Sequence, residues 1–321
     1  MIKSAAKKRW AKISSTAEIL IETKNLQISP FGKTSEGLQD FRGIQLSTTE
    51  LSSGGGWKNN AYRIDISRSD FSFSSWKGFD IANSKVSDCR FDDAEFVGDI
   101  RFFAVYFDTC RFGNSLFKNV NFTNSSLNSV SFEGLKSRDK ISFNAERIKD
   151  CNFEGEMKGI SFAASPISNS SFAGTLTDCT FFGNPTIVVL DQANEVYGRL
   201  AESEVRNRMD GVSFENAALV RCHVSNYCYL DKVRPPPTES NCIVKINLDF
   251  FDAAKYLMMK HCASEISGRA IMWLETFYKP DPRIPYGIAG PHDLEKPLGL
   301  KGANDFYKAL LEAATKTKTK V

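Results

Sequence analysis

The stretch from Val86 to Phe132 reads VSDCRFDDAEFVGDIRFFAVYFDTCRFGNSLFKNVNFTNSSLNSVSF. A large apolar residue recurs in it at every fifth position, and one extra residue shifts the frame just before Phe102. The same spacing extends back to Ile66. The centres of the units are Ile66, Phe71, Trp76, Ile81, Val86, Phe91, Phe96, Phe102, Phe107, Phe112, Phe117, Phe122, Leu127 and Phe132.

Two other positions of the five-residue unit are restricted. The residue two before each centre is uncharged, as at Cys110 and Ser115, and the residue two after it is mostly Gly, Asn or Asp, as at Asn114 and Asn119. A period of five matches neither a helix nor a simple strand. It matches a short extended segment followed by a bend, in which the centre and the residue two before it point inward. Four such bends close a square coil.

Two segments, Cys89–Asp93 (CRFDD) and Val120–Asn124 (VNFTN), resemble the consensus of the pentapeptide-repeat family. That consensus is Ala/Cys/Ser/Val, then Asn/Asp, then Leu/Phe and two variable residues. The resemblance implies a mainly β fold, a right-handed quadrilateral parallel β-helix with twenty residues per coil and phenylalanine stacked in columns inside. The residues assigned to that structural core are Phe71, Phe91, Phe107, Phe112, Phe117, Phe122 and Phe132.

The extent of the period predicts how the chain is organised. We expect an N-terminal cap at 1–60, a repeat β-helix at 61–186, a helical insertion at 187–210, a final repeat coil at 211–232 and a C-terminal α-helical region at 233–321. Within the cap, the segments 18–22, 26–28 and 43–46 resemble short strands. Within the last region, helical spacing spans 249–278, with a split near Ser267-Gly268, and a final helix is expected at 303–314. The closing Lys/Thr tail is expected to lack fixed structure.

Composition narrows the functional classes. The chain has 321 residues, 25% of them charged, and a formal net charge of +3, so it is neither strongly basic nor strongly acidic. It has no apolar run typical of a secretory signal or a membrane span. Its eight cysteines stand singly without a C-x-x-C pair, which predicts reduced thiols and a cytoplasmic location.

Residue patterns typical of catalysis are absent from the sequence. His223, His261 and His292 are far apart, and Gly54-Gly55-Gly56 lacks the spacing of a phosphate-binding loop. The acidic group Asp92, Asp93 and Glu95 is interpreted as outward turn residues and not as a metal site. We therefore expect no enzyme, no cofactor and no metal; an activity confined to 240–321 is the least favoured alternative.

The remaining candidates are surface residues. Phe103, Tyr106 and Leu116 occupy outward positions, where they form either a partner-binding patch or scattered surface apolar residues. In the C-terminal region, Trp273, Leu274 and Phe277 are candidates for a homodimer contact or for packing on the last coil.

A rigid, filled rod suits recognition of another protein. We therefore predict a non-enzymatic protein-binding scaffold that acts through the β-helix surface and the C-terminal helices, within which an immunity or protective role against a toxin or inhibitor is one possibility. The alternative is a gyrase-protecting DNA mimic, as in some members of the family that the sequence resembles. That role needs an acidic face, whereas residues 61–186 contain 14 Lys/Arg against 16 Asp/Glu with mixed signs. Direct nucleic-acid binding and membrane association are not expected.

Overall fold

The computed structural model describes residues 3–13, 15–48, 61–163, 166–183 and 207–321. The chain divides into two compact units, residues 1–161 and 162–321. The boundary falls inside the segment predicted as repeats. Most of the predicted insertion at 187–210, and the glycine loop at 54–56, lie outside the described residues.

The first unit opens with helices α1 (Lys3–Arg9), η1 (Trp10–Lys12) and α2 (Thr16–Glu22). The strand predicted at 18–22 is therefore wrong: Ser15 caps the helix, because its side-chain oxygen accepts a hydrogen bond from the Glu18 backbone N–H at 3.2 Å. The strand predicted at 26–28 is also wrong. Residues 24–26 all have positive φ, and Leu26 donates its N–H to the Thr23 hydroxyl in a turn.

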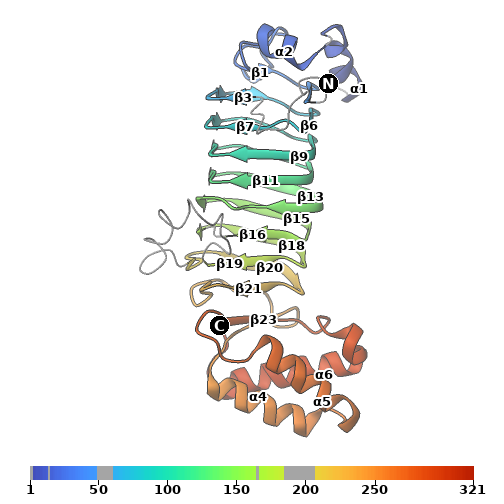
Figure 1. The fold of residues 1–321 in the computed structure, drawn as a ribbon, viewed down its shortest axis with the longest axis vertical. Coiled ribbons are helices and arrows are strands. Elements are labelled where there is room, and N and C mark those ends of the chain that lie inside the picture. The colour runs from blue at the N-terminus through green and yellow to red at the C-terminus, as the bar shows by residue number, and fades with distance from the viewer. Residues whose placement is uncertain (1–2, 14, 49–60, 164–165, 184–206) are drawn as a thin grey trace. The chain divides into compact units, whose positions relative to one another are not determined.

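The rest of the first unit is a stack of parallel coils (Figure 1). Its strands are β1 (Gln39–Asp40), β2 (Gln45–Ser47), β3 (Ala61–Tyr62), β4 (Asp65–Ser67), β5 (Ser69–Asp70), β6 (Ser75–Lys77), β7 (Ile81–Ala82), β8 (Lys85–Ser87), β9 (Glu95–Phe103), β10 (Tyr106–Asp108), β11 (Leu116–Thr123), β12 (Ser126–Asn128), β13 (Ser131–Ser142), β14 (Arg147–Lys149), β15 (Asn152–Lys158) and β16 (Ile160–Phe162). One sheet runs β4-β8-β10-β12-β14, and another runs β2-β6-β9-β11-β13-β15. Because β1 pairs with β5 and β2 with β6, coiling begins within the segment 1–60 that was predicted as a cap.

The register follows the coil length. Tyr106 lies opposite Ser126 of the next coil, twenty residues later. The extra residue in the sequence frame is absorbed between Val97 and Ile100, which pair with Lys118 and Val120, so that two residues oppose one. Such a bulge lets the inward positions stay aligned on either side of it.

Phenylalanine rings form columns through the stacked coils. Phe91 stacks on Phe112 with ring centroids 4.7 Å apart and planes 7° apart, and Phe112 stacks on Phe132 at 5.1 Å and 9°. The column extends upward through Phe71 to Phe41. Each ring is shielded from water by the coils above and below, so stability accumulates from neighbour to neighbour.

The corners of the coils use left-handed backbone. Asn83, Asp88, Asp93, Asn114 and Asn119 all have φ between 48° and 55°. Asn and Asp tolerate this conformation better than other residues with a side chain. Their recurrence two residues after the centres therefore explains the bend that the sequence pattern predicts.

The second unit contains further coils and a helical region. Its elements are β17 (Ile167–Ser168), β18 (Ser171–Thr177), β19 (Thr180–Phe182), β20 (Ser213–Val220), β21 (His223–Ser225), β22 (Cys242–Lys245), α4 (Leu248–His261), α5 (Ser264–Phe277), β23 (Tyr286–Ala289) and α6 (Glu295–Lys316). Strand β20 pairs in parallel with β18, and β21 with β19. Phe172 stacks on Phe214 at 5.1 Å, which continues the same mode of packing.

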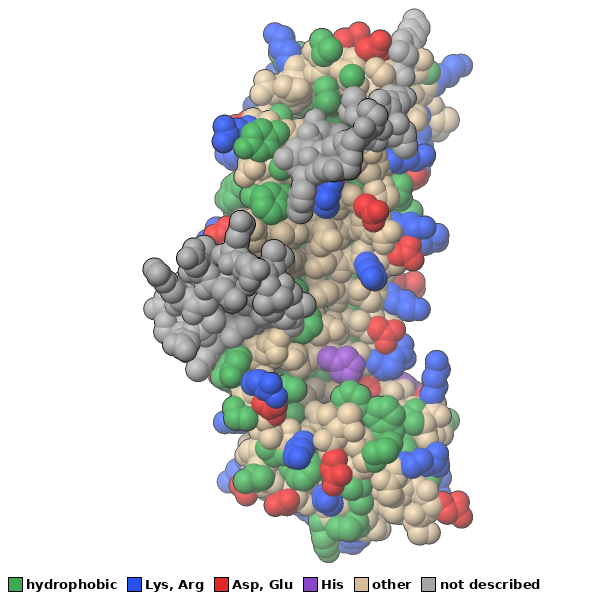
Figure 2. Space-filling view, viewed as in Figure 1, with side chains coloured by type: hydrophobic (Ala, Val, Ile, Leu, Met, Phe, Trp, Pro, Cys, Tyr) green, Lys and Arg blue, Asp and Glu red, His purple; other side chains and the backbone are tan. Residues whose placement is uncertain are grey.

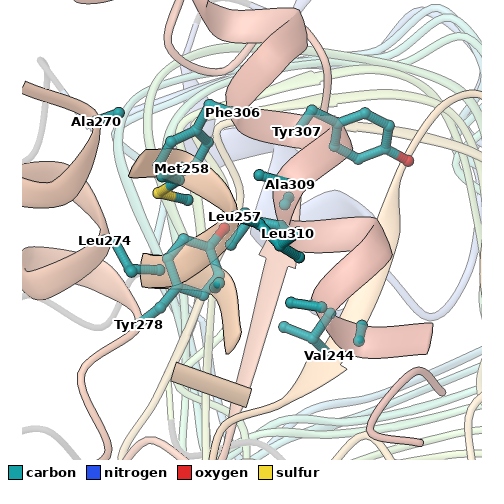
Figure 3. Packing of buried hydrophobic residues seen from close by; sticks show 14 of the residues in the cluster. Val244, Leu257, Met258, Ala270, Leu274, Tyr278, Phe306, Tyr307, Ala309 and Leu310 are labelled. Atoms are coloured by element: carbon teal, nitrogen blue, oxygen red, sulfur yellow. The ribbon is translucent and has the colours of Figure 1, made fainter. Parts of the chain in front are cut away.

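The helical region has its own apolar core, shown in Figure 3. Leu257 and Met258 of α4, Leu274 of α5 and Leu310 of α6 are buried together in it. The split predicted near Ser267-Gly268 is wrong, because the chain breaks at Cys262 and Ala263 and Gly268 lies inside α5. The final helix begins at Glu295 rather than near Ala303, and it is kinked at Gly299, whose φ is 72°.

The C-terminal tail is ordered, contrary to the prediction. The Lys245 N–H donates to the Thr319 carbonyl at 2.8 Å, and the Val321 N–H donates to the Ile243 carbonyl at 3.0 Å. The tail thus lies antiparallel along the edge of β22, whose other edge pairs with β23. An open strand edge is stabilised by such a partner, and the Lys/Thr composition does not reveal it.

Candidate interaction surfaces

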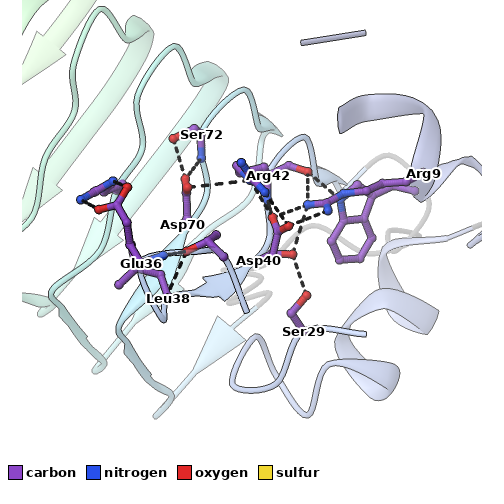
Figure 4. A network of polar contacts seen from close by, with 11 residues as sticks. Arg9, Ser29, Glu36, Leu38, Asp40, Arg42, Asp70 and Ser72 are labelled. Atoms are coloured by element: carbon purple, nitrogen blue, oxygen red, sulfur yellow. Dashed lines mark hydrogen bonds and ion pairs between the residues drawn. The ribbon is translucent and has the colours of Figure 1, made fainter. Parts of the chain in front are cut away.

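A compact network of charged side chains lies at the N-terminal end of the coils (Figure 4). The Asp40 carboxylate accepts hydrogen bonds from Arg9, at 2.5 and 2.8 Å, and from Arg42, at 2.8 Å to each oxygen. Burial by itself raises the pKa of Asp40, but the hydrogen bonds from Arg42 and Arg9 outweigh it and hold that pKa well below its usual range. The Trp10 indole N–H also donates to the Arg42 carbonyl at 3.0 Å. These contacts attach the N-terminal helices to the first coil.

Several other carboxylates of the first unit are paired with arginine. Asp92 contacts Arg111 at 2.9 Å, Asp80 contacts Arg101 at 2.5 Å, and Glu36 contacts Arg90. Paired carboxylates of this kind contribute little net negative potential to the surface.

One face of the coil stack collects basic side chains. We call it the β6–β15 face: the outward side chains of residues 75–77, 95–97, 116–118, 136–138 and 156–158. Its exposed cations are Lys77, Lys118, Lys136, Arg138 and Lys158, and its carboxylates are Glu95 and Glu156. Glu95 is held by Lys3 of α1 at 2.8 Å. In Figure 2, Lys and Arg side chains follow the right-hand edge of the coils with acidic side chains between them, while the face turned to the viewer is mostly uncharged.

The three outward residues chosen from the sequence are all half-buried and do not form one patch. Phe103 and Tyr106 flank the same corner, at the end of β9 and the start of β10. Leu116 lies on the β6–β15 face, opposite Glu95 and Lys136.

The seven phenylalanines assigned to the core all lie inside the coils. Their side chains are at most 4% exposed.

The three C-terminal candidates lie in different environments. Leu274 is buried in the helical core, Trp273 is partly buried against it, and Phe277 is 39% exposed. The Phe277 ring stacks on Trp273 at 5.1 Å and 3°, and on His223 of β21 at 5.7 Å and 12°. His223 is exposed, and its contact with a ring fifty-four residues away could not be predicted from local spacing. We call these three rings the aromatic ladder.

A shallow hollow of about 200 Å³ lies in the second unit between β20 and the segments 239–241 and 290–293. Its two central polar side chains, Asn241 and Asp293, already form hydrogen bonds within the protein. Asn241 bonds the Leu219 backbone N–H and carbonyl at 2.8 and 2.6 Å, and Asp293 accepts from the N–H groups of Arg221 and Gly290 at 2.7 and 2.6 Å. Burial raises the pKa of Asp293. These groups position the chain around the hollow.

In the described residues, side chains that could ligate a metal ion are dispersed, and the cysteine thiols are buried. Within the described ranges, no three His, Cys, Asp or Glu side chains lie close enough to hold a metal ion. All eight cysteines are free and buried. Burial raises the pKa of Cys151, Cys228 and Cys242 to about 12, which removes the thiolate needed for nucleophilic attack.

No helix in the described part of the chain combines the length and the apolar character that crossing a membrane requires.

Comparisons with known proteins were made on sequence and on structure. No protein-family model and no curated protein matches the chain. Similar solved structures include a trypsin-treated variant of QnrB1, a plasmid-mediated fluoroquinolone resistance protein, at 12% identity and a TM-score of 0.33, covering 62% of this chain and 90% of that one. HetL, a pentapeptide-repeat protein involved in heterocyst differentiation regulation in Nostoc sp. strain PCC 7120, matches at 8% identity and a TM-score of 0.20, over 68% and 94% of the two chains.

A third similar structure is Rfr23, from the cyanobacterium Cyanothece 51142, at 10% identity and a TM-score of 0.21, covering 33% of this chain and 86% of that one. The five-residue period, the parallel coils in twenty-residue register and the stacked phenylalanine columns are features of this chain itself. On those features, the chain folds as a parallel β-solenoid built from five-residue units.

Proposed function

We propose that this protein is a non-enzymatic scaffold that binds another protein through its outer surface. The observation that carries the proposal is the aromatic ladder of His223, Phe277 and Trp273. Exposed, rigid aromatic rings are the side chains that contribute most at protein interfaces, because they bury a large area with few rotatable bonds. The ladder joins a strand of the last coils to α5, so both the β-helix and the helical region provide contact surface.

Other large apolar side chains of the helices are also exposed. Met272 of α5 is 53% exposed, and Met259 of α4 is 57% exposed. The helical region thus presents several large apolar side chains to solvent, a feature of partner-binding surfaces.

Charge does not favour the alternative of a gyrase-protecting DNA mimic. In the first unit, Asp40, Asp80 and Asp92 are held by arginines. The β6–β15 face carries more cations than carboxylates. A DNA mimic needs the opposite arrangement, with unpaired carboxylates along one face.

The test is affinity capture from a lysate of the source cells, with chemical cross-linking and mass spectrometry. Phe277→Ala is compared with wild type and with Tyr256→Ala, a matched control on α4. We expect one specific protein that wild type and Tyr256→Ala capture and Phe277→Ala loses, with cross-links near α5. Captured proteins that do not depend on Phe277 contradict the proposal for this surface.

Light scattering on the same variants tests whether the chain forms a homodimer through the ladder. A dimer that Phe277→Ala separates identifies a second copy of the chain as the ladder's partner. Equal circular dichroism spectra of the variants show that the loss of binding does not come from unfolding.

A further inference from the structure

The β6–β15 face contains a row of like charges that the register of the coils places side by side. Lys118 lies opposite Arg138 on the next coil, and Val97 lies between Lys77 and Lys118. Lys136 pairs with Glu156 on the next coil. Arg138 and Lys158 each lie two residues after these partners, so they occupy equivalent positions on the two coils. We call Lys77, Lys118, Arg138 and Lys158 the basic row.

The basic row is only partly compensated. Lys118 contacts Asp139 at 3.4 Å, and the charge of Lys77 contributes to lowering the pKa of Glu95. Within the described residues, no carboxylate forms an ion pair with Lys77, Arg138 or Lys158. Like charges directly opposite each other on paired strands are destabilising. Lys118 and Arg138 are such a pair, and an anionic partner relieves their repulsion.

The surroundings of the basic row favour a protein over a nucleic acid. Val97 and Leu116, both half-buried, lie among the lysines on the same face. Nucleic-acid interfaces are much more positively charged than protein interfaces, whereas this face also contains Glu95 and Glu156. Val97 within the basic row and Leu116 beside it instead match an amphipathic acidic segment.

The spacing of the row identifies the conformation of that segment. Neighbouring coils lie about 4.8 Å apart. Acidic side chains at i, i+4, i+7 and i+11 of a helix recur about once per 5.4 Å turn. In an extended strand, side chains on one side recur about every 6.7 Å. The mismatch per step is about 0.6 Å for a helix and about 1.9 Å for a strand, and flexible lysine side chains absorb the smaller one over three or four coils.

We propose that the β6–β15 face docks an acidic, amphipathic helix of a partner protein, aligned with the axis of the coils. Its carboxylates contact the basic row, and its apolar side chains cover Val97 and Leu116. This inference rests on the proposed protein-binding function and names a second surface for it, apart from the aromatic ladder.

The probe is a fluorescein-labelled alanine-based peptide of roughly 20 residues, long enough to be helical, with glutamates at i, i+4, i+7 and i+11 and leucines beside them. The comparison peptide has the same composition with the glutamates distributed around the helix. Fluorescence anisotropy measures both against the full-length protein at several salt concentrations. We expect the one-sided peptide to bind at least about tenfold more tightly than its isomer, and added salt to weaken that binding.

The decisive variant is Lys118→Gln/Arg138→Gln/Lys158→Gln. It is expected to lose about tenfold or more in affinity for the one-sided peptide, and to have a thermal midpoint equal to or higher than that of wild type, because the like-charge row is removed. The control is Lys85→Gln/Arg147→Gln/Lys149→Gln, which removes three cations from the sheet of β8 and β14. It is expected to keep the affinity.

Three results overturn the inference. The first is equal binding of the two peptides. The second is tighter binding of a DNA or RNA duplex of equal charge than of the one-sided peptide. The third is a thermal midpoint of the basic-row variant below that of wild type, which would give the row a structural role. If the basic-row variant still captures the Phe277-dependent partner while no acidic peptide binds, this inference fails and the proposed function stands.

Discussion

The ring of Phe112 stacks on that of Phe132, one coil further along, with centroids 5.1 Å apart and planes 9° apart. Phe112 has no exposed surface, while the adjacent Arg111 is exposed and contacts Asp92. The Phe112 ring is completely buried between two other rings. Its removal is therefore expected to be among the most costly substitutions in the coils.

We therefore expect Phe112→Ala to lower the free energy of unfolding by about 3–5 kcal/mol, because it leaves a cavity between stacked rings. Arg111→Ala removes an exposed ion pair and is expected to cost at most about 1 kcal/mol. Chemical denaturation followed by circular dichroism compares the two variants. Equal midpoints would contradict the inward assignment of Phe112.

The Asp40 network predicts a dependence of stability on pH. The folded pKa of Asp40 lies below the ordinary value of about 3.9. Its interaction with Arg9 and Arg42 therefore contributes fully above that value and is lost as the pH falls below it. We expect Asp40→Asn to lower the thermal midpoint at neutral pH, with the difference from wild type shrinking as the pH falls below about 4.

Glu36→Gln provides the control for Asp40, because Glu36 also contacts an arginine but is exposed. It is expected to change the midpoint little at either pH. An Asp40→Asn difference that stays constant from neutral to acidic pH would show that the charge of Asp40 is not what stabilises the N-terminal edge.

The cysteines are expected to be unreactive in the folded protein. All eight are buried, and burial raises the pKa of Cys151, Cys228 and Cys242 to about 12. Titration with a chromogenic disulfide reagent at pH 8 should give slow or no reaction in buffer and eight equivalents in denaturant. Rapid labelling of several native thiols would contradict the filled interior.

The ordered tail predicts an effect of truncation. Removal of residues 319–321 deletes the hydrogen bonds to Lys245 and Ile243 and opens one edge of β22. We expect the truncated protein to melt at a lower temperature and to be cleaved faster by protease within 233–321. Replacing Lys316 and Lys318, which precede the paired segment, by Gln is the matched control and should leave both properties unchanged.

Local sequence was sufficient to predict the coil. The centres, such as Phe91 and Phe112, and the corner residues, such as Asn114 and Asn119, repeat within five residues, and each coil contacts mainly the next. The side chain that points inward and the backbone that bends are therefore both decided by short-range pattern. The error at 18–22 was of another kind, since a single cap at Ser15 outweighed an apolar run that resembles a strand.

The surfaces depended on the tertiary structure. Lys118 and Arg138 are neighbours only because the coil length and the bulge at residues 98–99 set the register, and His223 meets Phe277 only because the helical region packs beside β21. The sequence determined by itself that the chain coils and which residues fill it. The folded chain decided which outward residues adjoin, because such contacts depend on register and packing summed over whole coils and not on any local pattern.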